Sequence, residues 1–135
     1  MQDIKTCEKL SIKQGTFYFG ESNERFSEGY IELNPHTSLE IHNRLGGIEN
    51  LTQIKGSCVM IVFDVPHGNN HKLSEGDKLR IEPEGTWHIH SNPFDKTSLT
   101  HWYFDGRRAC WSVSNICCYE LGNRLSTRPL YKGPF

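Results

Sequence analysis

The chain has 135 residues and a net charge of −1 at neutral pH, which excludes an electrostatic preference for nucleic acid or acidic lipid. Its hydrophobic residues, 36% of the chain, suffice for the core of one β domain. No window approaches the roughly 18 apolar residues of a membrane span, and the N-terminus lacks a secretory signal. We therefore expect one cytoplasmic domain over residues 1–135, with a small molecule or another protein as partner and with no nucleic acid or membrane.

Short strand patterns follow one another along the chain, and no ten-residue helical period with caps at both ends interrupts them. Residues 1–15 are polar and weakly patterned, as in an arm or an irregular edge. Residues 121–135 predict an extended tail that packs or swaps onto a neighbour. The expected strands are residues 16–19, 28–33, 38–44, 50–55, 58–65, 71–73, 79–81, a strand that starts at 88, 98–105, and one or two within 110–120. This spacing predicts an all-β barrel or double-sheet jelly roll.

Five cysteines are present, and their number and spacing argue against a disulfide framework or a structural zinc site. The count is odd, and no pair has the C-x-x-C spacing. We expect reduced thiols that serve as small apolar residues. They are Cys7, Cys58, Cys110, Cys117 and Cys118.

The rest of the chain is organised around residues 76–92. A Gly-Asp turn opens this stretch, and Leu79 and Ile81 then alternate with charged residues, as in a half-buried strand. A Pro-x-Gly turn follows and leads to His88 at the start of the next strand. The proline restricts the backbone and Gly85 permits a positive φ, so we expect the imidazole of His88 to be aimed inward with little freedom.

This stretch resembles the second motif of the cupin superfamily, Pro-x-Gly-x-x-His-x-x-x-Asn. Pro83, Gly85, His88 and Asn92 match its four positions. The resemblance runs from about residue 29 to residue 104. It implies a single-domain cupin, a double-stranded β-helix whose barrel mouth carries the functional site.

The first cupin motif is His-x-His, then three or four residues, Glu, six residues and Gly. His42, Glu49 and Gly56 match three of these four positions, and Arg44 stands where the family has its second histidine. The resemblance implies a divalent metal ion (Fe, Mn, Ni or Zn) bound by His42, Glu49 and His88. Two imidazoles and a carboxylate form the ligand set of non-haem iron sites. His90 lies on the same strand face as His88 and is a candidate fourth ligand.

Arg44 separates two hypotheses about function. Its positive charge costs Coulomb energy beside a metal, but a guanidinium recognises carboxylate or phosphate bidentately. A plainer role is an ion pair with Glu40. In the first hypothesis the protein is a metal-dependent enzyme of oxygenase, isomerase or lyase type, and Arg44 anchors a small anionic substrate. In the second it is a non-catalytic small-molecule-binding or sensing cupin in which Arg44 has replaced a metal ligand.

The strand expected at residues 98–105 supplies two more candidates for substrate binding. His101 alternates with Leu99 and Tyr103, and we expect His101 and Tyr103 to line the cavity. The tryptophans are expected in the barrel core or at a dimer interface. Small cupins commonly pair through edge strands and exchanged arms, so the resemblance also implies a homodimer.

Overall fold

The computed structural model describes residues 1–106, which contain one short 3-10 helix, η1 (Ile4–Thr6), and ten β-strands. The strands are β1 (Glu8–Ile12), β2 (Gly15–Ser22), β3 (Phe26–Leu33), β4 (Thr37–Ser38), β5 (Gly47–Lys55), β6 (Cys58–Val62), β7 (Asn69–Leu73), β8 (Lys78–Ile81), β9 (His88–Asn92) and β10 (Ser98–Gly106). The strands expected within 110–120 and the tail expected at 121–135 lie outside the described residues. Within residues 1–106, no helix has the length and apolar character needed to cross a membrane.

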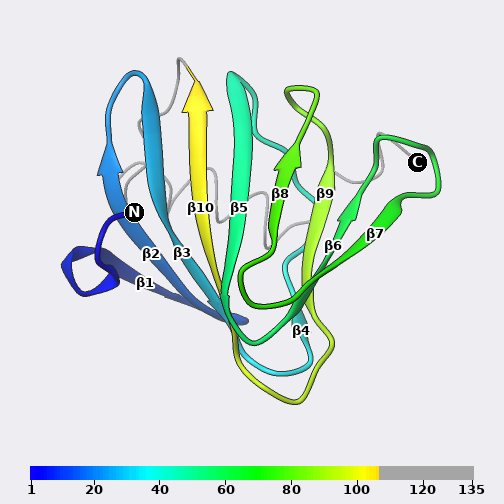
Figure 1. The fold of residues 1–135 in the computed structure, drawn as a ribbon, viewed down its shortest axis with the longest axis horizontal. Helices are drawn as coiled ribbons and strands as arrows, with labels where there is room; N and C mark the ends of the chain where they lie inside the picture. The colour runs from blue at the N-terminus through cyan, green and yellow to red at the C-terminus, as the bar shows by residue number, and fades with distance from the viewer. Residues whose placement is uncertain (107–135) are drawn as a thin grey trace.

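The strands form two antiparallel sheets that face each other (Figure 1). One sheet has the order β1-β2-β3-β10-β5-β8, and the other has the order β4-β9-β6-β7. From β5 onward the chain passes repeatedly between the sheets, because β5, β8 and β10 belong to the first and β6, β7 and β9 to the second. Two such sheets, built from crossing antiparallel strands, make a jelly roll, and the predicted fold class is confirmed.

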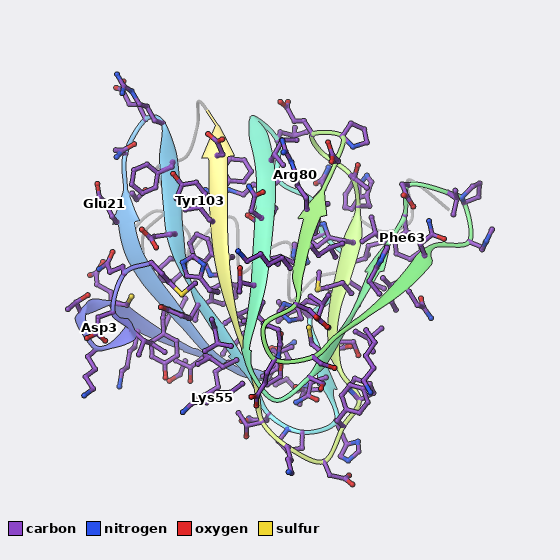
Figure 2. All side chains as sticks on the ribbon, in the orientation of Figure 1. Asp3, Glu21, Lys55, Phe63, Arg80 and Tyr103 are labelled. Carbon is purple, nitrogen blue, oxygen red and sulfur yellow. The ribbon has the colours of Figure 1, made fainter. Side chains whose placement is uncertain are left out.

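Alternate residues of the strands point into the space between the two sheets, and their side chains form the core there (Figure 2). Trp102 on β10 is 3% exposed and meets Phe19 of β2 edge to face, so its prediction as a core residue is confirmed. The buried cluster comprises Phe17, Phe19, Ile31, Leu33, Leu39, Leu51, Cys58, Met60, Val62, Leu73, Ile81 and Trp102.

The expected strand at residues 38–44 is largely irregular, which corrects the prediction. Thr37 and Ser38 pair with Asn92 and Ser91 of β9, and the next bridge joins His42 to His88. The register therefore shifts by one residue between these two places. Alternating side chains indicate alternating burial, which this segment has, but they do not show whether the hydrogen-bonded ladder is continuous.

Two other strands also differ from the predicted ones. Where β1 lies, the sequence predicts only an arm or an irregular edge. β1 is the edge strand of the six-stranded sheet, and an edge strand pairs on one side and needs little apolar surface, so its sequence pattern is weak. β6 was expected to be buried on both faces. Instead its residues alternate between buried and half-buried, since only one face of the four-stranded sheet packs on the core.

Candidate functional site

His42 and His88 face each other where the segment after β4 meets the start of β9. Their backbones exchange two hydrogen bonds, from His42 N to His88 O at 3.0 Å and from His88 N to His42 O at 2.9 Å. The imidazole centroids lie 4.5 Å apart at an interplanar angle of 63°. The structure thus brings together two of the three predicted metal ligands, which are 46 residues apart in the sequence.

Backbone carbonyls set the orientation of both rings. His42 Nδ1 lies 2.7 Å from the carbonyl oxygen of Glu40, and His88 Nδ1 lies 3.0 Å from that of Thr86. A carbonyl oxygen only accepts, so each Nδ1 carries the proton and donates it. In the neutral ring the lone pair then resides on Nε2, the ring nitrogen that can accept a hydrogen bond or bind a metal.

Burial keeps the histidines of β9 neutral. Burial lowers the pKa of His88 well below its ordinary value, and the nearby His42 lowers it further. Burial also lowers the pKa of His90 to about 3, again with a contribution from His42. At neutral pH both side chains therefore act as uncharged imidazoles.

Glu49 lies on β5, where it pairs with Phe104 of β10 and Ile81 of β8. Burial raises the pKa of its carboxyl group, and the positive charge of Arg44 partly opposes this. Its Oε2 atom is shielded from solvent and accepts no hydrogen bond from residues 1–106. A buried carboxylate oxygen in this state favours either a proton or a cation.

Arg44 is aimed at the six-stranded sheet. Its Nη2 donates to the hydroxyl of Ser27 on β3 at 2.9 Å, and its guanidinium carbon lies 3.8 Å from the ring centroid of Phe104. Stacking on an aromatic face is a favourable arrangement for a guanidinium. Among the ion pairs of the described residues 1–106, none joins Arg44 to Glu40.

His90 belongs to a separate buried network, which links β9 to β10 and β5. Its Nε2 lies 3.3 Å from Thr100 Oγ1, and the Thr100 hydroxyl donates to Gln53 Oε1 at 2.7 Å. The thiol of Cys58 also donates to that oxygen, at 3.2 Å, and burial raises the pKa of this thiol to about 11. Cys7 and Cys58 are free thiols, as predicted, and the other three cysteines lie outside residues 1–106.

His101 and Tyr103 do not line the barrel, which corrects the prediction. They lie on the face of β10 opposite Trp102 and Phe104, and the ring centroids of Tyr103 and Phe26 are stacked 5.1 Å apart. His101 Nε2 lies 2.9 Å from Glu28 Oε1 on the same outer face. Alternation correctly grouped the two residues, but the pattern alone does not say which face of the sheet is the inner one.

The turn between β8 and β9 holds the two facing histidines in place. Gly85 has φ +80°, and its carbonyl oxygen accepts a hydrogen bond from Asn43 Nδ2 at 3.0 Å. The expectation that Gly85 needs a backbone conformation that a Cβ disfavours is confirmed. Asn43 and Ser27 were missed because their partners depend on contacts between segments distant in the sequence.

The predicted metal centre is not assembled as a three-ligand group. Among residues 1–106, no three side chains of His, Cys, Asp or Glu are arranged to hold a metal ion. His42 and His88 have the required lone pairs, but Glu49 does not complete a group with them. Three protein ligands are near the minimum for a catalytic metal, and the described residues bring two of the predicted ones, His42 and His88, face to face.

The two antiparallel sheets and the two sequence motifs together show that this protein has the cupin fold, a double-stranded β-helix. The chain is similar to a Bacillus subtilis oxalate decarboxylase, with TM-score 0.69 and 20% identity over 82% of this chain and 31% of that one. It is similar to an uncharacterised conserved protein with a double-stranded β-helix domain from Klebsiella pneumoniae, with TM-score 0.67 and 14% identity over 81% of this chain and 91% of that one. It is also similar to the cupin domain of Schizosaccharomyces pombe Cnp3, with TM-score 0.65 and 10% identity over 78% of this chain and 68% of that one.

These likenesses concern the fold alone, because all the identities are low. The chain spans 43% of an oxalate oxidase structure that it also resembles, with TM-score 0.56 and 15% identity over 62% of this chain. No family model matches the sequence, and no curated protein does. The function therefore has to be argued from the side chains of the site.

Proposed function

We propose that the protein binds a small anionic molecule in the barrel mouth and that Arg44 anchors its acid group. The observation that carries this proposal is the position of Arg44, which is stacked on Phe104 and hydrogen-bonded to Ser27. These contacts orient the planar guanidinium before a ligand arrives, so less side-chain entropy is lost on binding. A guanidinium in a partly buried setting pairs with carboxylate or phosphate more strongly than it does in water.

The ligand class also agrees with the structural neighbours. Two of them are named for oxalate, a small organic acid, namely the oxalate oxidase and the oxalate decarboxylase. This supports an acid of similar size as the ligand. In this proposal the protein is a binding or sensing cupin, in which Arg44 occupies the place of a metal ligand.

Calorimetric titration with a panel of small carboxylates and inorganic phosphate tests the proposal. Arg44→Gln should weaken binding of every acid by about tenfold or more, because a charge-assisted bidentate pair is lost. Arg80→Gln is the matched control, since Arg80 is exposed on β8. If Arg44→Gln binds the acids as tightly as the wild type does, the proposal is wrong.

The second candidate is a metal-dependent cupin that uses His42, Glu49 and His88. The observation in its favour is the pair of Nε2 lone pairs, together with the buried Oε2 of Glu49. One of the similar structures, the Bacillus subtilis oxalate decarboxylase, has Mn(II) centres. A bound divalent metal would supply Lewis-acid or oxygen chemistry.

Titration with Mn(II), Fe(II), Ni(II) and Zn(II) separates the two candidates. Under the first, wild type binds none of them tightly, and Arg44→His gains affinity because a repelling charge becomes a ligand. Tight binding to wild type that is lost in His42→Ala, Glu49→Ala and His88→Ala would instead favour the metal-dependent candidate.

A further inference from the structure

A groove lies at the end of the barrel opposite to the facing histidines, where the last matched residues of both motifs are found. Gly56 follows β5, and Asn92 ends β9 (Figure 1). The groove has a volume of about 700 Å³. Two turns and one loop line it, namely residues 56–57 after β5, residues 74–75 after β7 and residues 94–97 after β9. Ligand pockets have volumes of about 300–1,000 Å³, so this groove has the size of a site for a small molecule.

Close backbone contacts and hydrogen bonds fix the walls of the groove. Gly56 has φ +65°, and a Cβ there would clash with the carbonyl oxygen of Thr97, so the turn after β5 packs directly on the loop after β9. The Gly56 N–H donates to Glu75 Oε2 at 3.2 Å, which ties the turn after β7 to the same place. Asn92 orders the loop, because its Oδ1 accepts from Phe94 N at 3.1 Å. A groove formed before a ligand arrives loses less entropy on binding.

The polar side chains that line the groove include every kind of hydrogen-bonding group. The carboxylates of Glu75 and Asp95 only accept hydrogen bonds, and the ammonium group of Lys96 only donates them. Hydroxyl groups, which do both, come from Ser57, Ser74 and Thr97. A ligand that satisfies this lining must therefore offer both donors and acceptors.

Phe94 adds an aromatic ring to this polar lining. Lys72 Nζ lies 5.2 Å from the centroid of the ring, which gives the ring a cationic neighbour on β7. An aromatic ring presents a large apolar surface, and the C–H groups of a ligand can pack on it.

Three classes of ligand match this lining poorly. A small acid would meet the carboxylates of Glu75 and Asp95. An organic cation would meet the ammonium groups of Lys72 and Lys96. An apolar molecule would remove water from all these groups without replacing its hydrogen bonds.

We propose that this groove binds a polyhydroxylated ring, that is, a sugar. Each sugar hydroxyl both donates and accepts, so one ring can serve carboxylate, ammonium and hydroxyl partners together, while its C–H groups pack on Phe94. Residues 74–75 and 95–97 are exposed, so the groove is open, and we expect a dissociation constant in the millimolar range. The groove is lined by none of the residues of the proposed anion site, so this inference does not depend on it.

Titrations followed by ¹H–¹⁵N correlation spectra of the whole chain test the proposal. The probes are the methyl pyranosides of glucose, galactose and mannose, with tetrahydropyran-2-methanol as a matched ring that lacks the ring hydroxyls. At least one glycoside should shift the backbone amide signals of the groove saturably, and the tetrahydropyran should not do so at the same concentration. The signals to follow are those of Gly56, Ser57, Lys96 and Thr97. No saturable shift with any glycoside, or equal shifts with the tetrahydropyran, overturns the proposal.

Two variants and a control locate the binding. Glu75→Gln keeps an acceptor for the Gly56 N–H but removes the charge, and Phe94→Leu removes the aromatic face. Each should weaken binding of the glycoside about five- to tenfold. Glu84→Gln, in the exposed turn after β8, removes a carboxylate elsewhere and should bind as the wild type does.

Melting curves show whether the variants are folded. If Phe94→Leu is unfolded, Glu75→Gln alone decides the matter, since its hydrogen bond to the turn is retained. Wild-type affinity in the folded variants would show that the sugar binds elsewhere, and the proposal would then be wrong. Loss of acid binding in Arg44→Gln without any effect on the glycoside would show that the two sites are independent, as expected.

Discussion

Asn92, the last matched residue of the second cupin motif, stabilises the fold. It lies at the opposite end of β9 from His88. It is fully buried, and its Nδ2 lies within 3.1 Å of three carbonyl oxygens, those of Leu33, Asn34 and Lys96. Its Oδ1 accepts from the backbone of Phe94 at 3.1 Å. One amide side chain thus joins the end of β3 to the loop between β9 and β10.

Asn92→Ala should lower the free energy of unfolding by about 2–4 kcal/mol, because buried carbonyls lose their donor and a cavity remains. Urea denaturation measures this change. Asn70→Ala is the control, since Asn70 is exposed on β7 and its replacement should cost less than about 0.5 kcal/mol. Equal effects of the two variants would show that the Asn92 network does not stabilise the fold.

At the scale of elements, the turn between β8 and β9 connects both facing histidines to one loop. The carbonyl of Gly85 binds Asn43, the neighbour of His42, and the carbonyl of Thr86 binds the ring of His88. A change of backbone conformation at Gly85 therefore acts on both rings. Gly76 also has a positive φ, +91°, but a Cβ there would meet nothing within 4 Å.

Gly85→Ala and Gly76→Ala form a matched pair that separates the fold from the site. Each should cost about 1–2 kcal/mol of stability, because an L residue is strained at positive φ. Only Gly85→Ala should also shift the His42 and His88 ring signals, since its added Cβ meets Leu45 Cδ2 at 2.7 Å in the loop that follows His42. Unchanged ring signals in Gly85→Ala would mean that the turn does not position the site.

At the scale of the whole molecule, buried histidines couple the fold to pH. Burial lowers the pKa of His88, His90 and His101 in the folded state. For His101, the hydrogen bond and charge of Glu28 only partly oppose this effect. Below about pH 6.5 the unfolded chain therefore binds more protons than the folded one, and stability falls as the pH falls.

Urea denaturation from about pH 7.5 to about pH 5 checks this coupling. Each fully buried neutral histidine contributes a loss of about 1.4 kcal/mol per pH unit below about pH 6.5, and Glu49, whose pKa is raised by burial, offsets part of it. His90→Gln keeps a donor for Thr100 and should reduce the slope by about that amount. Constant stability over this range would contradict the coupling.

The expected homodimer stays a prediction, which light scattering at micromolar concentration checks.

The sequence by itself determined the fold class, because periods of two residues and closely spaced turns leave few alternatives to a two-sheet antiparallel barrel. It also determined the backbone conformation of Gly85, since a turn reflects local geometry, whereas His42 and His88 were indicated together by the resemblance to the two cupin motifs. The tertiary structure decided that His101 and Tyr103 face outward, because alternation does not label the inner face of a sheet. It also decided which partners Arg44 and His90 have, Ser27 and Phe104 in one case and Thr100 in the other. Those partners come from strands distant in the sequence, and only the packing of one strand beside another brings them within hydrogen-bonding distance.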